Sequence, residues 1–62
     1  MIADIEFQGN TLVVIDSNNC KIAYINMGDG QYITHNSDTV KIRKNGRIEV
    51  YSDRGCLLRT EG

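Results

Sequence analysis

Apolar and polar residues alternate along much of the chain, which is the pattern of half-buried β-strands. Within residues 39–59, Val40 and Ile42 alternate with threonine and basic residues, and Ile48 and Val50 alternate with charged residues and a tyrosine. An Asn-Gly pair, which is a strong hairpin signal, separates the two runs, and a second glycine-containing turn follows them. This region therefore predicts three short antiparallel strands joined by two turns.

The faces of the strands predict the register of the first hairpin, because residues directly opposite in an antiparallel pair lie on the same face. A two-residue Asn-Gly turn would place Ile42 opposite Glu49 and mix apolar and charged residues on both faces, which is disfavoured. We therefore expect a three-residue loop over residues 44–46, with Gly46 in the left-handed backbone region. The pairs that this loop predicts are Arg43–Arg47, Ile42–Ile48, Lys41–Glu49 and Val40–Val50.

A loop of the same length over residues 53–55 suits the second hairpin. The pairs that it predicts are Ser52–Cys56, Val50–Leu58 and Glu49–Arg59. Glu49 would then lie between Lys41 and Arg59 in a cross-strand charge ladder, which is worth about 0.2–1 kcal/mol per pair.

The N-terminal residues predict a further hairpin. Ala3, Ile5 and Phe7 alternate with polar residues, and Gly9-Asn10 suits a type II′ turn with glycine at its first position. The pairs that this turn predicts are Phe7–Leu12 and Ile5–Val14.

The remaining strand signals complete an all-β prediction. Residues 12–15 are a continuous apolar run, which is typical of a strand covered on both faces. Two more strands are predicted at residues 20–26 and 31–35, turn signals recur about every nine residues, and no capped helical stripe is found. We predict one domain over residues 1–62, an antiparallel up-and-down meander of six or seven short strands curled into a small barrel or half-barrel.

Alternation divides this predicted sheet into two faces. The residues expected on the inner face are Ala3, Ile5, Phe7, Leu12, Val14, Cys20, Ile22, Tyr24, Tyr32, Val40, Ile42, Ile48, Val50 and Leu58. The outer face of residues 11–35 would carry a contiguous apolar patch, which usually marks an interface. The residues of this predicted protein interface are Val13, Ile15, Ala23, Ile25 and Ile33. The alternatives are that a terminal segment or strand folds over the patch, or that the sheet closes differently.

Charge is distributed unevenly along the chain, although the net charge is only −1. Residues 1–38 carry five acids and one base, a net of −4, whereas residues 39–62 carry six bases and three acids, a net of +3. On the predicted outer face of residues 39–59, basic groups surround one tyrosine, as in platforms that bind single-stranded nucleic acid. The candidate polyanion-binding residues are Lys41, Arg43, Arg47, Tyr51 and Arg59, and the alternative is a solvated surface.

No specific catalytic or metal-binding motif is present in the sequence. His35 is the only histidine, and its closeness to Ser37 and Asp38 is explained by a turn rich in polar residues. His35, Cys20 and Cys56 lack the paired spacing of zinc ligands. We therefore predict a non-enzymatic protein with no cofactor, no metal and no evident small-molecule substrate, and we expect both cysteines to be buried free thiols.

The chain length and the hydropathy of the sequence indicate which classes of partner to expect. A domain of 62 residues is near the lower size limit for folding alone and often gains stability from a partner subunit. We therefore expect a homo-oligomer or a protein partner, with nucleic acid as the second class. No apolar run approaches the ~18 residues of a membrane span, and we expect a cytoplasmic protein. Its size would suit an accessory protein of a phage or mobile element.

The run KNGRIEVYSDRGCLLR resembles the Tyr-Asp repeat units of large bacterial shell toxins, which also join short hairpins through Asn-Gly turns. It covers about a quarter of the chain. The resemblance implies a ladder of hairpins and carries no function to this chain.

Overall fold

The computed structural model describes residues 1–61, which form seven strands and no helix. The strands are β1 (Asp4–Gln8), β2 (Thr11–Ile15), β3 (Lys21–Asn26), β4 (Gln31–His35), β5 (Thr39–Lys44), β6 (Arg47–Ser52) and β7 (Leu57–Glu61). Every pairing between them is antiparallel. The predicted all-β class and the number of strands are therefore confirmed.

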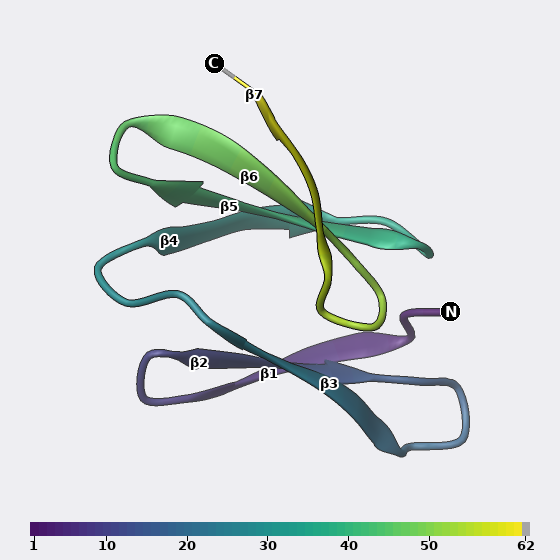
Figure 1. Cartoon of the computed structure of the whole chain (residues 1–62). Helices are drawn as coiled ribbons and strands as arrows, with labels where there is room; N and C mark the ends of the chain where they lie inside the picture. The colour runs from purple at the N-terminus through teal and green to yellow at the C-terminus, as the bar shows by residue number, and fades with distance from the viewer. Residues whose placement is uncertain (62) are drawn as a thin grey trace.

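The strands form two sheets that lie one above the other (Figure 1). The smaller sheet has the order β1-β2-β3 and the larger sheet has the order β4-β5-β6-β7. Pairing is interrupted between β3 and β4, where residues 27–30 carry the chain from one layer to the other. Over the described residues neither sheet closes into a barrel, so each sheet keeps two open edges.

Gly30 makes this change of layer possible, because the backbones approach too closely for a side chain. A Cβ at this position would lie 2.7 Å from the carbonyl oxygen of Arg43 and 2.9 Å from that of Met27. Both distances are shorter than a carbon–oxygen contact allows, so glycine is the residue that fits here.

The hydrophobic core lies between the two sheets. Leu12 and Val14 of β2 pack in one cluster with Val40 and Ile42 of β5, and all four are fully buried. The complete buried cluster is Ile2, Leu12, Val14, Ala23, Ile25, Met27, Val40 and Ile42. The predicted covering of β2 on both faces is confirmed, since every residue from 12 to 15 is buried.

The hairpin of β1 and β2 has the predicted register. Phe7 lies opposite Leu12 and Ile5 lies opposite Val14. Gly9 has a φ of 59°, as the first position of a type II′ turn requires.

Most of β3 faces the opposite way to the prediction, although Ile22, at the bulge, packs against the core as predicted. Ala23 and Ile25 lie opposite Val14 and Leu12 and belong to the core, whereas Tyr24 lies on the other face and is 59% exposed. A bulge near the start of β3 shifts the register against β2. The turn between β6 and β7 then packs on this face, because a Cβ on Gly55 would lie 3.4 Å from that of Ala23.

The turn between β5 and β6 has two residues, and the predicted three-residue loop is wrong. Asn45 and Gly46 both have positive φ, 55° and 76°, as in the type I′ turn that matches strand twist. Ile42 consequently lies opposite Glu49, and Lys41 lies opposite Val50. The four predicted pairs Arg43–Arg47, Ile42–Ile48, Lys41–Glu49 and Val40–Val50 are therefore wrong.

This register places apolar and charged residues on the same face of the sheet. It is tolerated because Val50 is buried outside the main core. It lies on the outer face of the larger sheet and is fully buried there. Its neighbours on the two flanking strands are Lys41 and Arg59. Long basic side chains shield apolar groups with their aliphatic stems while their charged ends stay in water.

The hairpin of β6 and β7 is only partly as predicted. The N–H of Ser52 donates to the carbonyl of Cys56 at 2.8 Å, which confirms the loop over residues 53–55. A register shift then places Val50 opposite Arg59, since Leu58 is an extra residue on β7. The predicted pairs Val50–Leu58 and Glu49–Arg59 are therefore wrong.

Candidate interaction surfaces

The predicted apolar interface is not a contiguous exposed patch. Ala23 and Ile25 lie in the core between the sheets. Val13 and Ile15 lie on the other face of the smaller sheet and are also buried. Only Ile33 is exposed, at 41%, and it belongs to the other sheet. The prediction of one exposed patch is wrong because the bulge in β3 reverses its faces.

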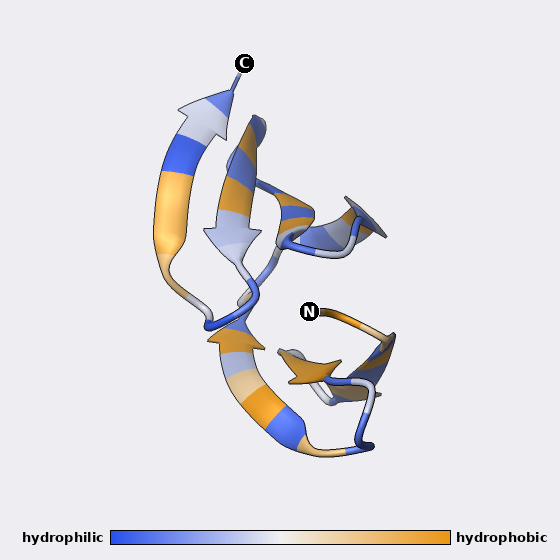
Figure 2. Cartoon of the chain, turned by 90° about the vertical axis from the view of Figure 1, so that its right-hand side faces the viewer, coloured by the Kyte–Doolittle hydropathy of each residue, from blue (hydrophilic) through white to orange (hydrophobic). Residues whose placement is uncertain are grey.

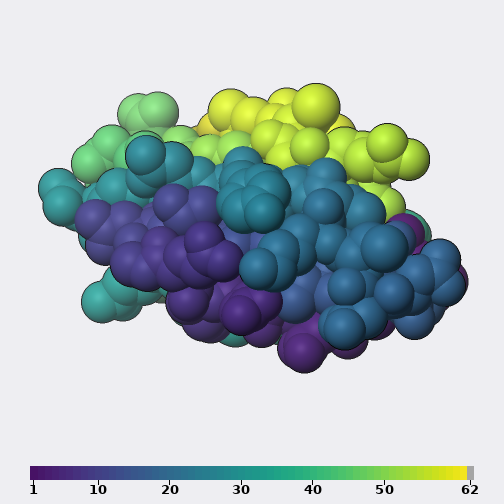
Figure 3. All heavy atoms as spheres, turned by 90° about the horizontal axis from the view of Figure 1, so that it is seen from below, coloured from purple at the N-terminus to yellow at the C-terminus, as the bar shows by residue number. Residues whose placement is uncertain are grey.

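Among the described residues six large apolar side chains are exposed, and two of them, Leu57 and Leu58, are consecutive residues of β7. Leu57 and Leu58 are 53% and 52% exposed. This strand is an edge of the larger sheet and pairs only with β6. Figure 2 shows the apolar start of β7 on an outer strand, and Figure 3 shows β7 in yellow along one margin of the molecule.

On the opposite side, aromatic side chains connect the two sheets. The rings of Phe7 on β1 and Tyr32 on β4 meet edge to face, with centroids 5.5 Å apart. The Tyr32 hydroxyl lies 2.6 Å from Nδ1 of His35. His35 therefore has a packing and hydrogen-bonding partner within its own strand.

The five candidate polyanion-binding residues do not share one face. The register places Lys41, Arg43 and Arg59 on the outer face of the larger sheet. Tyr51 lies on the inner face, where it packs against the core and donates a hydrogen bond of 2.8 Å to Glu49 Oε1. The predicted platform of cations around a tyrosine is therefore wrong.

Glu61 takes the place that the sequence assigned to Glu49. Its carboxylate lies 2.9 Å from Arg59 Nε and 3.7 Å from Lys41 Nζ. The hydrogen bond from Arg59, and then the charge of Lys41, lower the pKa of Glu61. Two of the five candidates are thereby paired with an acid, and the alternation of Arg59 and Glu61 along β7 was the available sequence signal.

Three of the five basic side chains without such a pair lie at the end of the β5–β6 hairpin, and the other two, Lys21 and Arg54, lie elsewhere. Register places Lys44 directly opposite Arg47, next to the turn, and Arg43 precedes Lys44 on the other face. Within residues 1–61, none of these three has a carboxylate within 4.0 Å. The predicted register placed Arg43 opposite Arg47, so it did not predict that Lys44 lies opposite Arg47.

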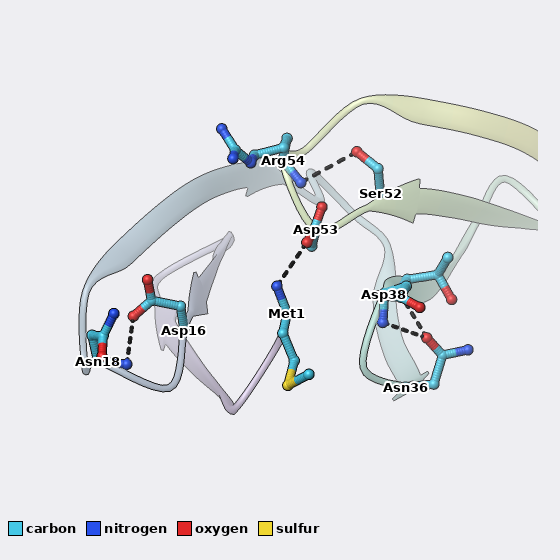
Figure 4. A network of polar contacts seen from close by, with 9 residues as sticks. Met1, Asp16, Asn18, Asn36, Asp38, Ser52, Asp53 and Arg54 are labelled. Carbon is cyan, nitrogen blue, oxygen red and sulfur yellow. Dashed lines mark hydrogen bonds and ion pairs between the residues drawn. The ribbon is translucent and has the colours of Figure 1, made fainter.

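The acidic and polar side chains at the other end of the molecule serve its turns (Figure 4). Asp16 Oδ1 accepts the backbone N–H of Asn18 at 2.9 Å, and Asn36 Oδ1 accepts that of Asp38 at 2.8 Å. The amino group of Met1 lies 3.0 Å from Asp53 Oδ2, and this hydrogen bond lowers the pKa of Asp53.

Neither cysteine is buried, contrary to the prediction. Cys20 and Cys56 are exposed and have free thiols. Over the described chain no three His, Cys, Asp or Glu side chains are grouped so that they could hold a metal ion, and no pocket is found.

Two further findings complete the description. None of residues 1–61 belongs to a helix long and apolar enough to cross a membrane. The chain matches no protein-family model, no curated protein and no solved structure.

Proposed function

We propose that this protein is a non-enzymatic assembly module that self-associates through the open edge of β7. The observation that carries this proposal is the pair of half-exposed leucines, Leu57 and Leu58, on a strand with one free edge. An unprotected apolar edge strand offers backbone donors and acceptors together with apolar surface, and it favours pairing with another chain.

The other open edges are better protected. β1 carries the exposed acids Asp4 and Glu6, and charged side chains discourage edge pairing. The edge of β4 lies beside the Phe7–Tyr32 aromatic pair, and the turn containing Gly55 packs on β3. β7 also carries charges, at Arg59 and Glu61, but its first two residues, Leu57 and Leu58, are both apolar and exposed.

The charges of β7 favour a second copy as the occupant. After the bulge, the strand reads Arg59-Thr60-Glu61, and an antiparallel copy centred on Thr60 would place Arg59 opposite Glu61 in both directions. Opposite charges facing each other across strands are stabilising. The exposed leucines would flank this paired segment, and the four strands of each larger sheet would join into one sheet.

Two finer expectations belong to this proposal. The predicted half-barrel would correspond to the open larger sheet, which a second copy extends at β7. A reducing compartment such as the cytoplasm suits two exposed free thiols, Cys20 and Cys56.

Light scattering on a sizing column tests the proposal over a range of concentrations. We expect wild-type protein to reach twice the monomer mass of 7.0 kDa, and Leu58→Lys to stay at the monomer mass while remaining folded by circular dichroism. The matched control is Tyr24→Lys, which places the same charge on another exposed site, in the smaller sheet. A wild-type monomer at every concentration, or equal loss of association in the control, would contradict the proposal.

A further inference from the structure

We propose a second interaction surface, at which the tip of the β5–β6 hairpin binds the phosphate backbone of double-stranded nucleic acid. The tip is defined by Arg43, Lys44, Asn45, Gly46 and Arg47. This surface shares no residue with β7 and stands on different observations.

The first observation is an unrelieved repulsion. Lys44 and Arg47 are directly opposite each other, and like charges in this position destabilise a hairpin. The ion pairs of residues 1–61 leave both without an acidic partner, while Lys41 and Arg59 have Glu61. A bound phosphate would relieve this repulsion.

The second observation is that Lys44 is held in place. A Cβ on Gly28 would lie 3.6 Å from Lys44 Cε, and one on Gly30 would lie 3.3 Å from Lys44 Cβ. The stem of Lys44 therefore runs along the β3–β4 loop, at the same end of the molecule as the hairpin tip (Figure 1). Asp29 is the acid of this loop, and among residues 1–61 it forms no ion pair within 4.0 Å.

The third observation is the shape of the tip, which favours a duplex over a single strand. Strand alternation places Arg43 on one face of the ribbon, and Lys44 and Arg47 on the other. Within residues 1–61 the flanking strands pair with the hairpin only as far as Arg43 and Ile48, so residues 44–47 alone form a two-stranded ribbon beyond the four-stranded sheet. The major groove of B-DNA is about 12 Å wide, admits such a ribbon and has phosphates along both walls. Tyr51, the aromatic group that could stack on an unpaired base, packs instead against the core.

The salt dependence of binding tests this inference, measured by the anisotropy of a short fluorescein-labelled DNA duplex of mixed sequence. Three phosphate contacts predict a slope of log affinity against log salt of about −2.7, which is 0.9 for each contact. Arg43→Gln with Arg47→Gln leaves one contact, so the slope should fall to about −0.9.

The matched control is Lys21→Gln with Arg54→Gln, which changes the net charge equally at the other end of the hairpins. We expect this control to keep the wild-type slope, and thermal melts will show that both double variants are folded. The inference is overturned by any of four results: no duplex binding at low salt, equal loss in the control, tighter binding to the single strand, or binding to phosphatidylserine vesicles but not to duplex.

Discussion

Lys41 Nζ lies 3.7 Å from Glu61 Oε1, although the two residues belong to β5 and β7 and strand β6 runs between them. Val50 of β6 lies directly opposite Lys41 on the same face, and it is fully buried although it lies outside the main core. Two ionic side chains therefore reach across a strand and help to shield an apolar residue from water. This arrangement also ties the edge strand β7 to the sheet.

The Lys41–Glu61 relationship predicts an acid-sensitive contribution to stability. Since Arg59 and Lys41 lower the pKa of Glu61 in the folded protein, the contribution is fully present above the ordinary glutamate pKa of about 4.3 and is lost as pH falls through the lower folded value. Urea denaturation of wild type and Glu61→Gln, from neutral to acidic pH, should show a difference in unfolding free energy that shrinks on acidification. A difference that is constant with pH would contradict this reading.

Two leucine substitutions should lower the unfolding free energy by very different amounts. Leu12→Ala removes a fully buried side chain between the sheets and should lower the unfolding free energy by about 2–5 kcal/mol. Leu57→Ala, at a half-exposed edge position, should change it by less than about 0.5 kcal/mol. The measurement is chemical denaturation at a protein concentration where both variants have the monomer mass. Equal costs would show that the sheets do not pack through Leu12.

The type I′ turn predicts opposite outcomes for two changes at Asn45. Its φ of 55° lies in the left-handed region, which a β-branched residue adopts at a cost of roughly 1–2 kcal/mol. Asn45→Val should therefore destabilise the protein by about that amount, whereas Asn45→Gly should be tolerated. Thermal unfolding checks both. Equal stability of the two variants would favour a loop in which residue 45 has negative φ.

The Tyr51–Glu49 contact predicts an alkaline transition. Partial burial raises the pKa of Tyr51, and the hydrogen bond to Glu49 raises it further. The neutral hydroxyl thus contributes stability below the ordinary tyrosine pKa of about 10, and this contribution is lost as pH rises through the higher folded value. An absorbance titration of tyrosinate in the wild type should contain a component above pH ~10 that Tyr51→Phe lacks. Loss of a component at or below pH ~10 instead would contradict the contact.

Several features of the fold could be predicted from the sequence because they depend on neighbouring residues. Period-2 alternation located the strands, and Gly9 fixed the first hairpin through its positive φ. The continuous apolar run of β2 correctly indicated burial on both faces. The candidate sites were harder to predict from the sequence, since they depend on which face of each strand is covered.

β3 shows what only the tertiary structure decided. Its sequence offers two acceptable inward faces, one with Ile22 and Tyr24 and one with Ala23 and Ile25. The bulge at its start and the close packing of Gly55 on Ala23 selected Ala23 and Ile25 for the core and left Tyr24 exposed, while Ile22 at the bulge still packs against the core. Both depend on contacts between strands, so alternation along one strand could not distinguish them.

At β6, too, the sequence and the tertiary structure determined different things, because the preferred turn and the matching of apolar faces favoured different registers. By itself the sequence determined a tight turn at Asn45-Gly46, because this pair adopts the type I′ conformation most easily. The matching of apolar residues across the two strands favoured a three-residue loop instead. The tertiary structure decided the matter because Val50 is fully buried on the outer face beside Lys41 and Arg59, which removed the cost of placing an apolar residue there.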